Sequence, residues 1–212
     1  DWLESLEVKP KKDLQTLLKG LKTQDRFDKV LIILLDRSGS MLDHFEGTTK
    51  IKAAQQVLQS DLLPNMAGWA YGLLIFHGYR NVDWIVYPGG KSAALATVGS
   101  SAEGETPMRA ALEMAWGWVR QNAVQSRFVM LSDGEPTDSS KDEILRLAEL
   151  QKSIPIDVVG IGTNGGFGYD PIFLSALARI TGGMFVEVHS VKMLGEAILK
   201  LSPVNRPLLG PV

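Results

Sequence analysis

The chain has 212 residues, a net charge of −2 and a hydrophobic fraction of 45%, which suits one compact domain with a sizeable core and excludes a protein that coats nucleic acid. It contains no cysteine, so disulfides, thiolate catalysis and zinc–thiolate sites are excluded. No apolar run reaches the roughly 18 residues of a membrane span, and we expect a soluble, cytoplasmic protein.

The first predicted element is an amphipathic helix near the N-terminus. Leu14, Leu17, Leu18 and Leu21 recur at helical spacing, and we expect this apolar stripe to lie on the protein's own domain. We therefore divide the chain into an N-terminal helical extension over residues 1–28, one domain over 29–202 and a C-terminal tail over 203–212.

Six short runs of branched and aromatic residues follow, and each is typical of a β-strand. These runs are Val30–Leu35, Ala70–Phe76, Asp83–Tyr87, Arg127–Leu131, Ile156–Ile161 and Met184–Val188. Segments with helical spacing lie between most of them, including Ile51–Leu62, Met108–Val119 and Ile144–Leu150. Strand and helix therefore alternate along most of the chain.

Three patterns predict where helices begin. Thr106-Pro107 and Asp170-Pro171 each place a capping residue before a proline, and Ser140-x-x-Glu143 has the form of a capping box. We expect the side chains of Thr106, Asp170 and Ser140 to cap three helices.

The connections between strands predict the fold class. Only the second and third strands are joined by a segment too short for a crossover helix, so we predict an antiparallel hairpin at a sheet edge. Runs such as VLIILL are apolar on both faces, as in strands covered by helices on both sides. The sequence predicts a doubly wound α/β fold with a mostly parallel six-stranded sheet, one antiparallel edge strand and helices on both faces.

Side chains with oxygen atoms follow two of these strands and precede one helix. They are Asp36, Ser38 and Ser40, then Thr106, then Ser132 and Asp133. Because the carboxyl ends of parallel strands meet at one edge, we expect these groups to converge. All are hard ligands with no histidine or cysteine among them, so the sequence predicts a divalent cation, with Mg²⁺ preferred and Mn²⁺ or Ca²⁺ as alternatives.

Each of these motifs also has an ordinary structural interpretation. D-x-S-x-S forms turns, Thr106 can cap a helix, and Asp133-Gly134 is a common turn dipeptide. Only the combination of the three motifs predicts a metal site. We expect the neighbouring Glu105 and Glu135 to be solvated loop residues, and we assign no ligand role to the three histidines, His44, His77 and His189.

Three segments together resemble the metal-ion-dependent adhesion site (MIDAS) of the von Willebrand factor A family. In chain order they are D-R-S-G-S at 36–40, G-E-T-P-M around Thr106 and L-S-D-G-E-P-T-D around Asp133. The resemblance covers about residues 29–201. It implies that Ser38, Ser40 and Thr106 bind the cation directly, and that Asp36 and Asp133 bind it directly or through water.

The same resemblance implies a function. Family members bind proteins, and a glutamate or aspartate of the partner completes the metal shell; no catalysis is required. In some members the last helix slides, and the corresponding segment here is Val191–Leu201. The sequence looks most like stand-alone bacterial or intracellular members, such as those encoded beside chaperone-like ATPases. We expect a monomer with a protein partner, for which an associated ATPase is one candidate, and neither nucleic acid nor a membrane span.

Two other functions remain open. Asp36 at a strand end could serve a metal-dependent phosphoryl-transfer hydrolase, although such enzymes carry a second aspartate where this chain has Ser38. A scaffold with an empty site is the other alternative. Dinucleotide binding is rejected, because the G-x-G-x-x-G pattern from Gly160 to Gly165 does not open a helix.

Overall fold

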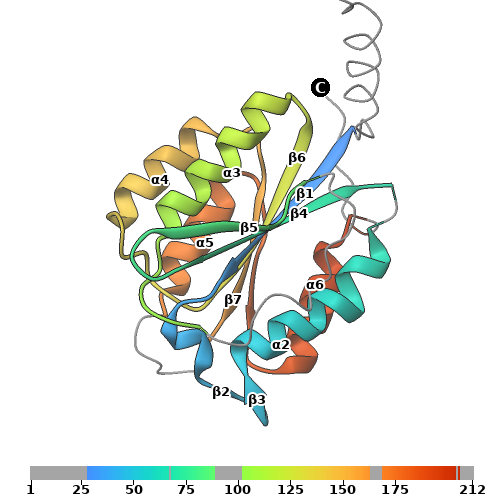
Figure 1. Cartoon of the computed structure of the whole chain (residues 1–212), viewed down its shortest axis with the longest axis vertical. Coiled ribbons are helices and arrows are strands. Elements are labelled where there is room, and N and C mark those ends of the chain that lie inside the picture. The colour runs from blue at the N-terminus through green and yellow to red at the C-terminus, as the bar shows by residue number, and fades with distance from the viewer. Residues whose placement is uncertain (1–27, 67, 89–101, 163–168, 204, 206–212) are drawn as a thin grey trace, which may run out of the picture.

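The computed structural model describes residues 28–66, 68–88, 102–162, 169–203 and 205 (Figure 1). Within these ranges, a six-stranded sheet lies between two layers of helices (Figure 1). The predicted N-terminal helix and most of the predicted C-terminal tail lie outside the described residues. None of the described helices combines the length and apolar character needed to cross a membrane.

The sheet has the predicted architecture. Its strands, in the spatial order β5-β4-β1-β6-β7-β8, are β5 (Asn81–Val86), β4 (Ala70–His77), β1 (Lys29–Asp36), β6 (Gln125–Ser132), β7 (Ile156–Ile161) and β8 (Phe185–Val188). Only β5 is antiparallel to its neighbour, and it lies at the edge beyond β4. The doubly wound fold and its antiparallel edge hairpin are therefore confirmed.

Helices cover both faces of this sheet. One face carries α2 (Lys50–Val57), which continues as a π-helical turn over Leu58–Leu62, and α6 (Val191–Leu201); the other carries α3 (Met108–Asn122), α4 (Lys141–Leu150) and α5 (Pro171–Ile180) (Figure 1). Alternate residues of β1 face the two layers, and all six from Val30 to Leu35 are fully buried. Burial on both sides explains why this strand is continuously apolar.

One small element was not predicted. A two-stranded hairpin, β2 (His44–Phe45) with β3 (Thr48–Thr49), lies between β1 and α2. Each strand has only two residues, too few for a readable alternation of polar and apolar positions. The Oε2 of Glu46 in its turn accepts a hydrogen bond from the backbone N of Val191 at 2.8 Å, so this hairpin contacts the first turn of α6.

Two of the three predicted caps form. Asp170 Oδ1 accepts from the backbone N of Phe173 at 3.0 Å, and Ser140 Oγ accepts from the backbone N of Glu143 at 3.2 Å. The capping box is only half made, because the Glu143 carboxylate accepts from Ser139 Oγ at 2.6 Å rather than returning to the cap residue. The prediction for Thr106 is wrong. The helix α3 begins at Met108, its N-cap residue is Pro107, and this N-cap makes no side-chain hydrogen bond.

The glycines of the rejected dinucleotide pattern have a packing role. A Cβ atom on Gly160 would lie 2.6 Å from the hydroxyl of Tyr169, and one on Gly162 would lie 2.6 Å from its ring. The two glycines therefore make room for an aromatic side chain. The third glycine of the pattern, Gly165, lies outside the described residues.

The topology has a switch point at the carboxyl end of the sheet. The chain leaves β1 towards β4 on one side, whereas it leaves β6 towards β7 on the other. In open α/β sheets, ligands bind at the carboxyl ends of the strands where the winding direction changes. Here that position lies between the ends of β1 and β6.

Candidate metal centre

Asp36 is the last residue of β1, and its carboxylate is held by two hydrogen bonds. Its Oδ1 accepts from the backbone N of Ser38 at 2.8 Å, and its Oδ2 accepts from Ser132 Oγ at 2.5 Å. Ser132 is the last residue of β6, so this contact ties the carboxyl ends of the two central strands together. Ser132 was considered in the sequence only as an oxygen donor at a strand end, and the structure places it directly on Asp36.

A chain of hydroxyls connects this carboxylate to the second one. Ser38 Oγ lies 3.1 Å from Ser40 Oγ, and Ser40 Oγ donates to Asp133 Oδ1 at 2.8 Å. Ser40 is placed by a short 3-10 helix, Gly39–Leu42, which is separated from the end of β1 by two residues. The loop after β1 therefore meets the loop after β6, as the sequence predicts.

Thr106 reaches the same place from a third segment. A Cβ atom built on Gly134 would lie 3.1 Å from Thr106 Oγ1 and 3.7 Å from Asp36 Oδ2, so both oxygens border the small space above this glycine. The backbone N of Thr106 donates to Thr137 Oγ1, and the backbone N of Thr137 donates to the Thr106 carbonyl, both at 3.0 Å. All five predicted ligands converge, although metal binding by them remains a prediction.

The electrostatics of the site favour a cation. Asp36 and Asp133 are buried, with 0% and 2% of their surface exposed. Burial, together with repulsion from Asp133, raises the pKa of Asp36 from 3.8 to about 7, against the opposing hydrogen bonds from Ser132 and Ser38. A divalent ion would relieve both causes, and the oxygen-only donor set suits Mg²⁺, Mn²⁺ or Ca²⁺. The residues therefore fit the metal that the sequence predicts.

Lys50 is a member of this site that sequence reasoning missed. Its Nζ lies 2.5 Å from Asp133 Oδ2 and 3.4 Å from Asp43 Oδ2, and the residue is only 5% exposed. A signal was present, because Lys50 continues the buried stripe of α2 at i, i+4 and i+7 with Ala54 and Val57. A lysine on an apolar stripe needs a buried partner.

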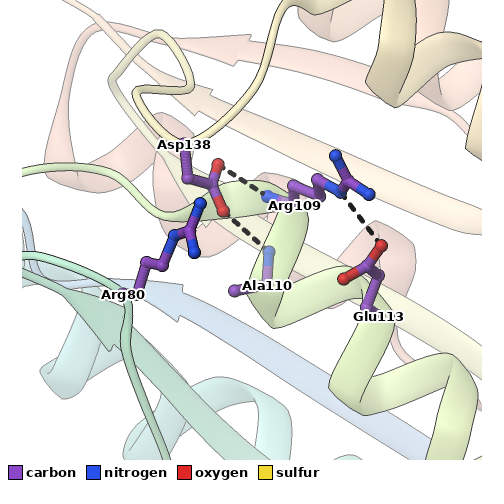
Figure 2. A pocket seen from close by; sticks show the side chains of 5 residues that line it. All are labelled: Arg80, Arg109, Ala110, Glu113 and Asp138. Atoms are coloured by element: carbon purple, nitrogen blue, oxygen red, sulfur yellow. Dashed lines mark hydrogen bonds and ion pairs between the residues drawn. The ribbon is translucent and has the colours of Figure 1, made fainter.

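Asp138 provides the helix cap that the sequence analysis assigned to Thr106. Its two carboxylate oxygens accept from the backbone N of Arg109 at 3.1 Å and of Ala110 at 2.8 Å (Figure 2). It thus caps α3 from a different segment and supplies what Thr106 does not. A cavity of about 250 Å³ beside this cap is lined by Arg80, Arg109, Ala110, Glu113 and Asp138 (Figure 2).

The two glutamates beside the ligand motifs lie in exposed loops, as predicted. Glu105 and Glu135 are exposed, and Glu135 pairs with Lys141 at 2.7 Å. His189 Nδ1 lies 2.9 Å from the Gly162 carbonyl oxygen. In the described part of the chain, no three His, Cys, Asp or Glu side chains form a group that could hold a metal ion, so any metal at this site depends on the hydroxyls.

No protein-family model and no curated protein matches this sequence. Solved structures do. The vWF domain of the type V pili tip protein Mfa5 from Porphyromonas gingivalis has a TM-score of 0.63 at 13% identity, over 88% of this chain and 98% of that one. The ArnB paralog VWA2 from Sulfolobus acidocaldarius has a TM-score of 0.62 at 18% identity, over 84% of this chain and 46% of that one.

The chain has the von Willebrand factor A fold. A third structure with this fold is proximal thread matrix protein 1 from the mussel byssus, with a zinc-occupied MIDAS motif; its TM-score is 0.60 at 17% identity, over 88% of this chain and 50% of that one. This chain spans about half the length of the Sulfolobus and mussel proteins. At these identities the likeness concerns the von Willebrand A fold alone.

Proposed function

We propose that this von Willebrand A domain binds a divalent cation at the carboxyl ends of β1 and β6 and presents it to an acidic side chain of a protein partner. The observation that carries the proposal is the convergence of three hydroxyls on two buried carboxylates, one of which has a strongly raised pKa. The zinc-occupied MIDAS motif of the mussel protein, which shares the fold, supports a metal at this place.

The donor set supports an adhesive role for the cation. Ser38, Ser40 and Thr106 are neutral ligands, so a cation bound through their hydroxyls keeps much of its charge. Such a cation attracts a further anionic ligand. A partner carboxylate is the protein group that best meets this requirement.

The surface beside the site makes partner binding depend on the cation. Asp43, whose side chain is 65% exposed and shares the ammonium group of Lys50 with Asp133, and the exposed Glu105 lie close in sequence to the proposed ligands. Without a cation, these charges repel an acidic partner. A bound cation adds two positive charges at the contact point and so reduces this repulsion.

Cation binding is tested first by thermal stability. Mg²⁺ or Mn²⁺ at about a hundred times the dissociation constant should stabilise the folded protein by about 2.7 kcal/mol. Thr106→Val, which replaces the hydroxyl with a methyl group, should reduce this stabilisation sharply, whereas Thr48→Val on the neighbouring hairpin should leave it unchanged. Equal melting temperatures of the wild-type protein in cation and in chelator would contradict the proposal.

The open coordination position is tested with acetate as the simplest carboxylate. Acetate should displace water from the Mn²⁺-loaded protein, which is measured as a loss of water-proton relaxation enhancement. Partner capture on immobilised protein should then require the cation, with Thr106→Val as the control bait. An associated ATPase among the captured proteins would support the partner class that the sequence suggests.

A phosphoryl-transfer role for Asp36 receives no support from the site. The position of the second aspartate is held by Ser38, whose hydroxyl contacts another hydroxyl at 3.1 Å, and a serine is a poor donor of a proton to a leaving group. Turnover of a generic phosphate ester that disappears in Asp36→Ala would overturn this judgement.

A further inference from the structure

We infer that Lys50 sets the affinity of the site for its cation, by acting as a built-in counter-ion to Asp133. This inference rests on the proposed function, and it concerns a residue outside the metal-ligand motifs. The two oxygens of Asp133 have different partners: Oδ1 accepts from Ser40 Oγ at 2.8 Å, and Oδ2 accepts from Lys50 Nζ at 2.5 Å. One oxygen therefore faces the ligand hydroxyls while the other faces the lysine.

The position of Lys50 keeps its ammonium group at the site. It is the first residue of α2, a helix whose N-cap, Thr49, accepts a hydrogen bond from the backbone N of Lys52 at 3.4 Å. The next residue, Ile51, is fully buried. The side chain of Lys50 is only 6% exposed. If its ammonium group moved away from Asp133, it would be a buried charge without that partner, which is energetically costly.

Counting charges shows what this contact does to a bound cation. When both are ionised, Asp36 and Asp133 supply two buried negative charges, and Lys50 supplies one buried positive charge. Lys50 Nζ also lies 3.4 Å from the carboxylate of Asp43, whose side chain is 65% exposed, so water screens that third negative charge. A bound cation therefore interacts with buried charges that sum to −1, whereas without Lys50 they would sum to −2. Lys50 thereby weakens cation binding, and it leaves the bound ion more of its positive charge for an acidic partner.

The same contact keeps the site assembled without a cation. Asp133 is 2% exposed, and a buried carboxylate without a counter-charge is strongly destabilising. With Lys50 in place, Asp133 has a partner whether or not a cation is bound. We therefore expect the lysine to reduce the dependence of folding on the cation.

The test compares ions of different charge in variants of Lys50. Lys50→Met should bind Mn²⁺ about tenfold more tightly than the wild type in calorimetry, and Tb³⁺ about thirtyfold more tightly by luminescence, because repulsion by a fixed charge grows with the charge of the ion. Lys50→Arg, which keeps the charge, should bind both ions with affinities close to those of the wild type. In chelator, Lys50→Met should melt below the wild type, and Mn²⁺ should raise its melting temperature by more.

The outcomes separate this inference from the proposed function. If the wild type binds Mn²⁺ and Lys50→Met binds it with the same or a weaker affinity, the inference alone is wrong. It is also wrong if Lys50→Met gains the same factor in affinity for Mn²⁺ and for Tb³⁺, because an equal gain would indicate a structural effect. If neither protein binds any cation, the proposed function fails and the inference fails with it. Lys50→Gln, a neutral variant that can still hydrogen-bond to Asp133, should show the same ion-charge dependence and serves if Lys50→Met does not fold.

Discussion

Ser132 Oγ donates a 2.5 Å hydrogen bond to Asp36 Oδ2 and so joins the last residues of β6 and β1. The parallel register, in which Leu35 pairs with Leu131, places these two side chains next to each other at the carboxyl end of the sheet. The bond holds a carboxylate in a buried site, where the ionised form is costly.

The stability of the cation-free protein should fall as pH rises from about 4 to about 7. Asp36 has a folded-state pKa of about 7 against an ordinary value of 3.8, so the folded state retains a proton that the unfolded chain has released. The difference corresponds to about 4 kcal/mol, lost progressively over this interval and constant above it. Urea denaturation in chelator at several pH values measures the effect.

The control for this experiment is Asp36→Asn. Other carboxyls of this protein titrate in the opposite sense, since lysine and backbone contacts lower the pKa of Asp170. The quantity to examine is therefore the difference between the wild type and Asp36→Asn. A difference that does not vary between pH 4 and pH 7 would contradict the raised pKa.

Cation affinity should rise with pH over the same interval. Below the pKa of Asp36, about 7, a proton competes with the cation for the carboxylate, so the affinity should fall by up to about tenfold for each pH unit. Above pH 8 the affinity should level off. Calorimetric titration with Mn²⁺ at a series of pH values tests this, and affinity independent of pH between 5 and 7 would show that the Asp36 carboxylate does not take part.

Asp138→Ala should destabilise the protein by about 1–2 kcal/mol, as for the loss of a helix cap. It removes the acceptors of the backbone N–H groups of Arg109 and Ala110. Because α3 begins two residues after Thr106, the substitution should also weaken Mn²⁺ binding. Asp142→Ala, which removes an exposed acid from the first turn of α4, is the matched control and should cost only a few tenths of a kcal/mol.

Gly160→Ala should destabilise the protein by about 1–3 kcal/mol through overpacking. The added Cβ would lie 2.6 Å from the Tyr169 hydroxyl and 2.9 Å from the Phe185 ring. Tyr169→Phe should recover part of the loss by removing the nearer atom. Gly117→Ala provides the contrast, because its added Cβ would have no neighbouring atom within 4 Å. This substitution should stabilise α3 by about 0.5–1 kcal/mol. Thermal melts of the wild type, Gly160→Ala, Gly160→Ala with Tyr169→Phe, and Gly117→Ala measure these differences.

Much of the fold could be predicted because its signals are local. Strands buried on both faces are continuously apolar, and a connection too short for a helix permits only a hairpin; both features are read from adjacent residues. The three ligand motifs could be placed at one edge for a similar reason, since each follows a strand or precedes a helix within a single fold class. Asp36, Ser40 and Thr106 converge as that argument requires.

The tertiary structure decided the contacts between segments that are distant in sequence. Lys50 and Asp133 are 83 residues apart, and Asp138 caps a helix that begins earlier in the chain. The local sequence pattern predicts neither the ion pair between the buried Lys50 and Asp133 nor the capping of α3 by a side chain other than Thr106. Periodicity reports which face of an element is buried, whereas the pairing of buried charges and free amides depends on which segments the packed sheet brings together.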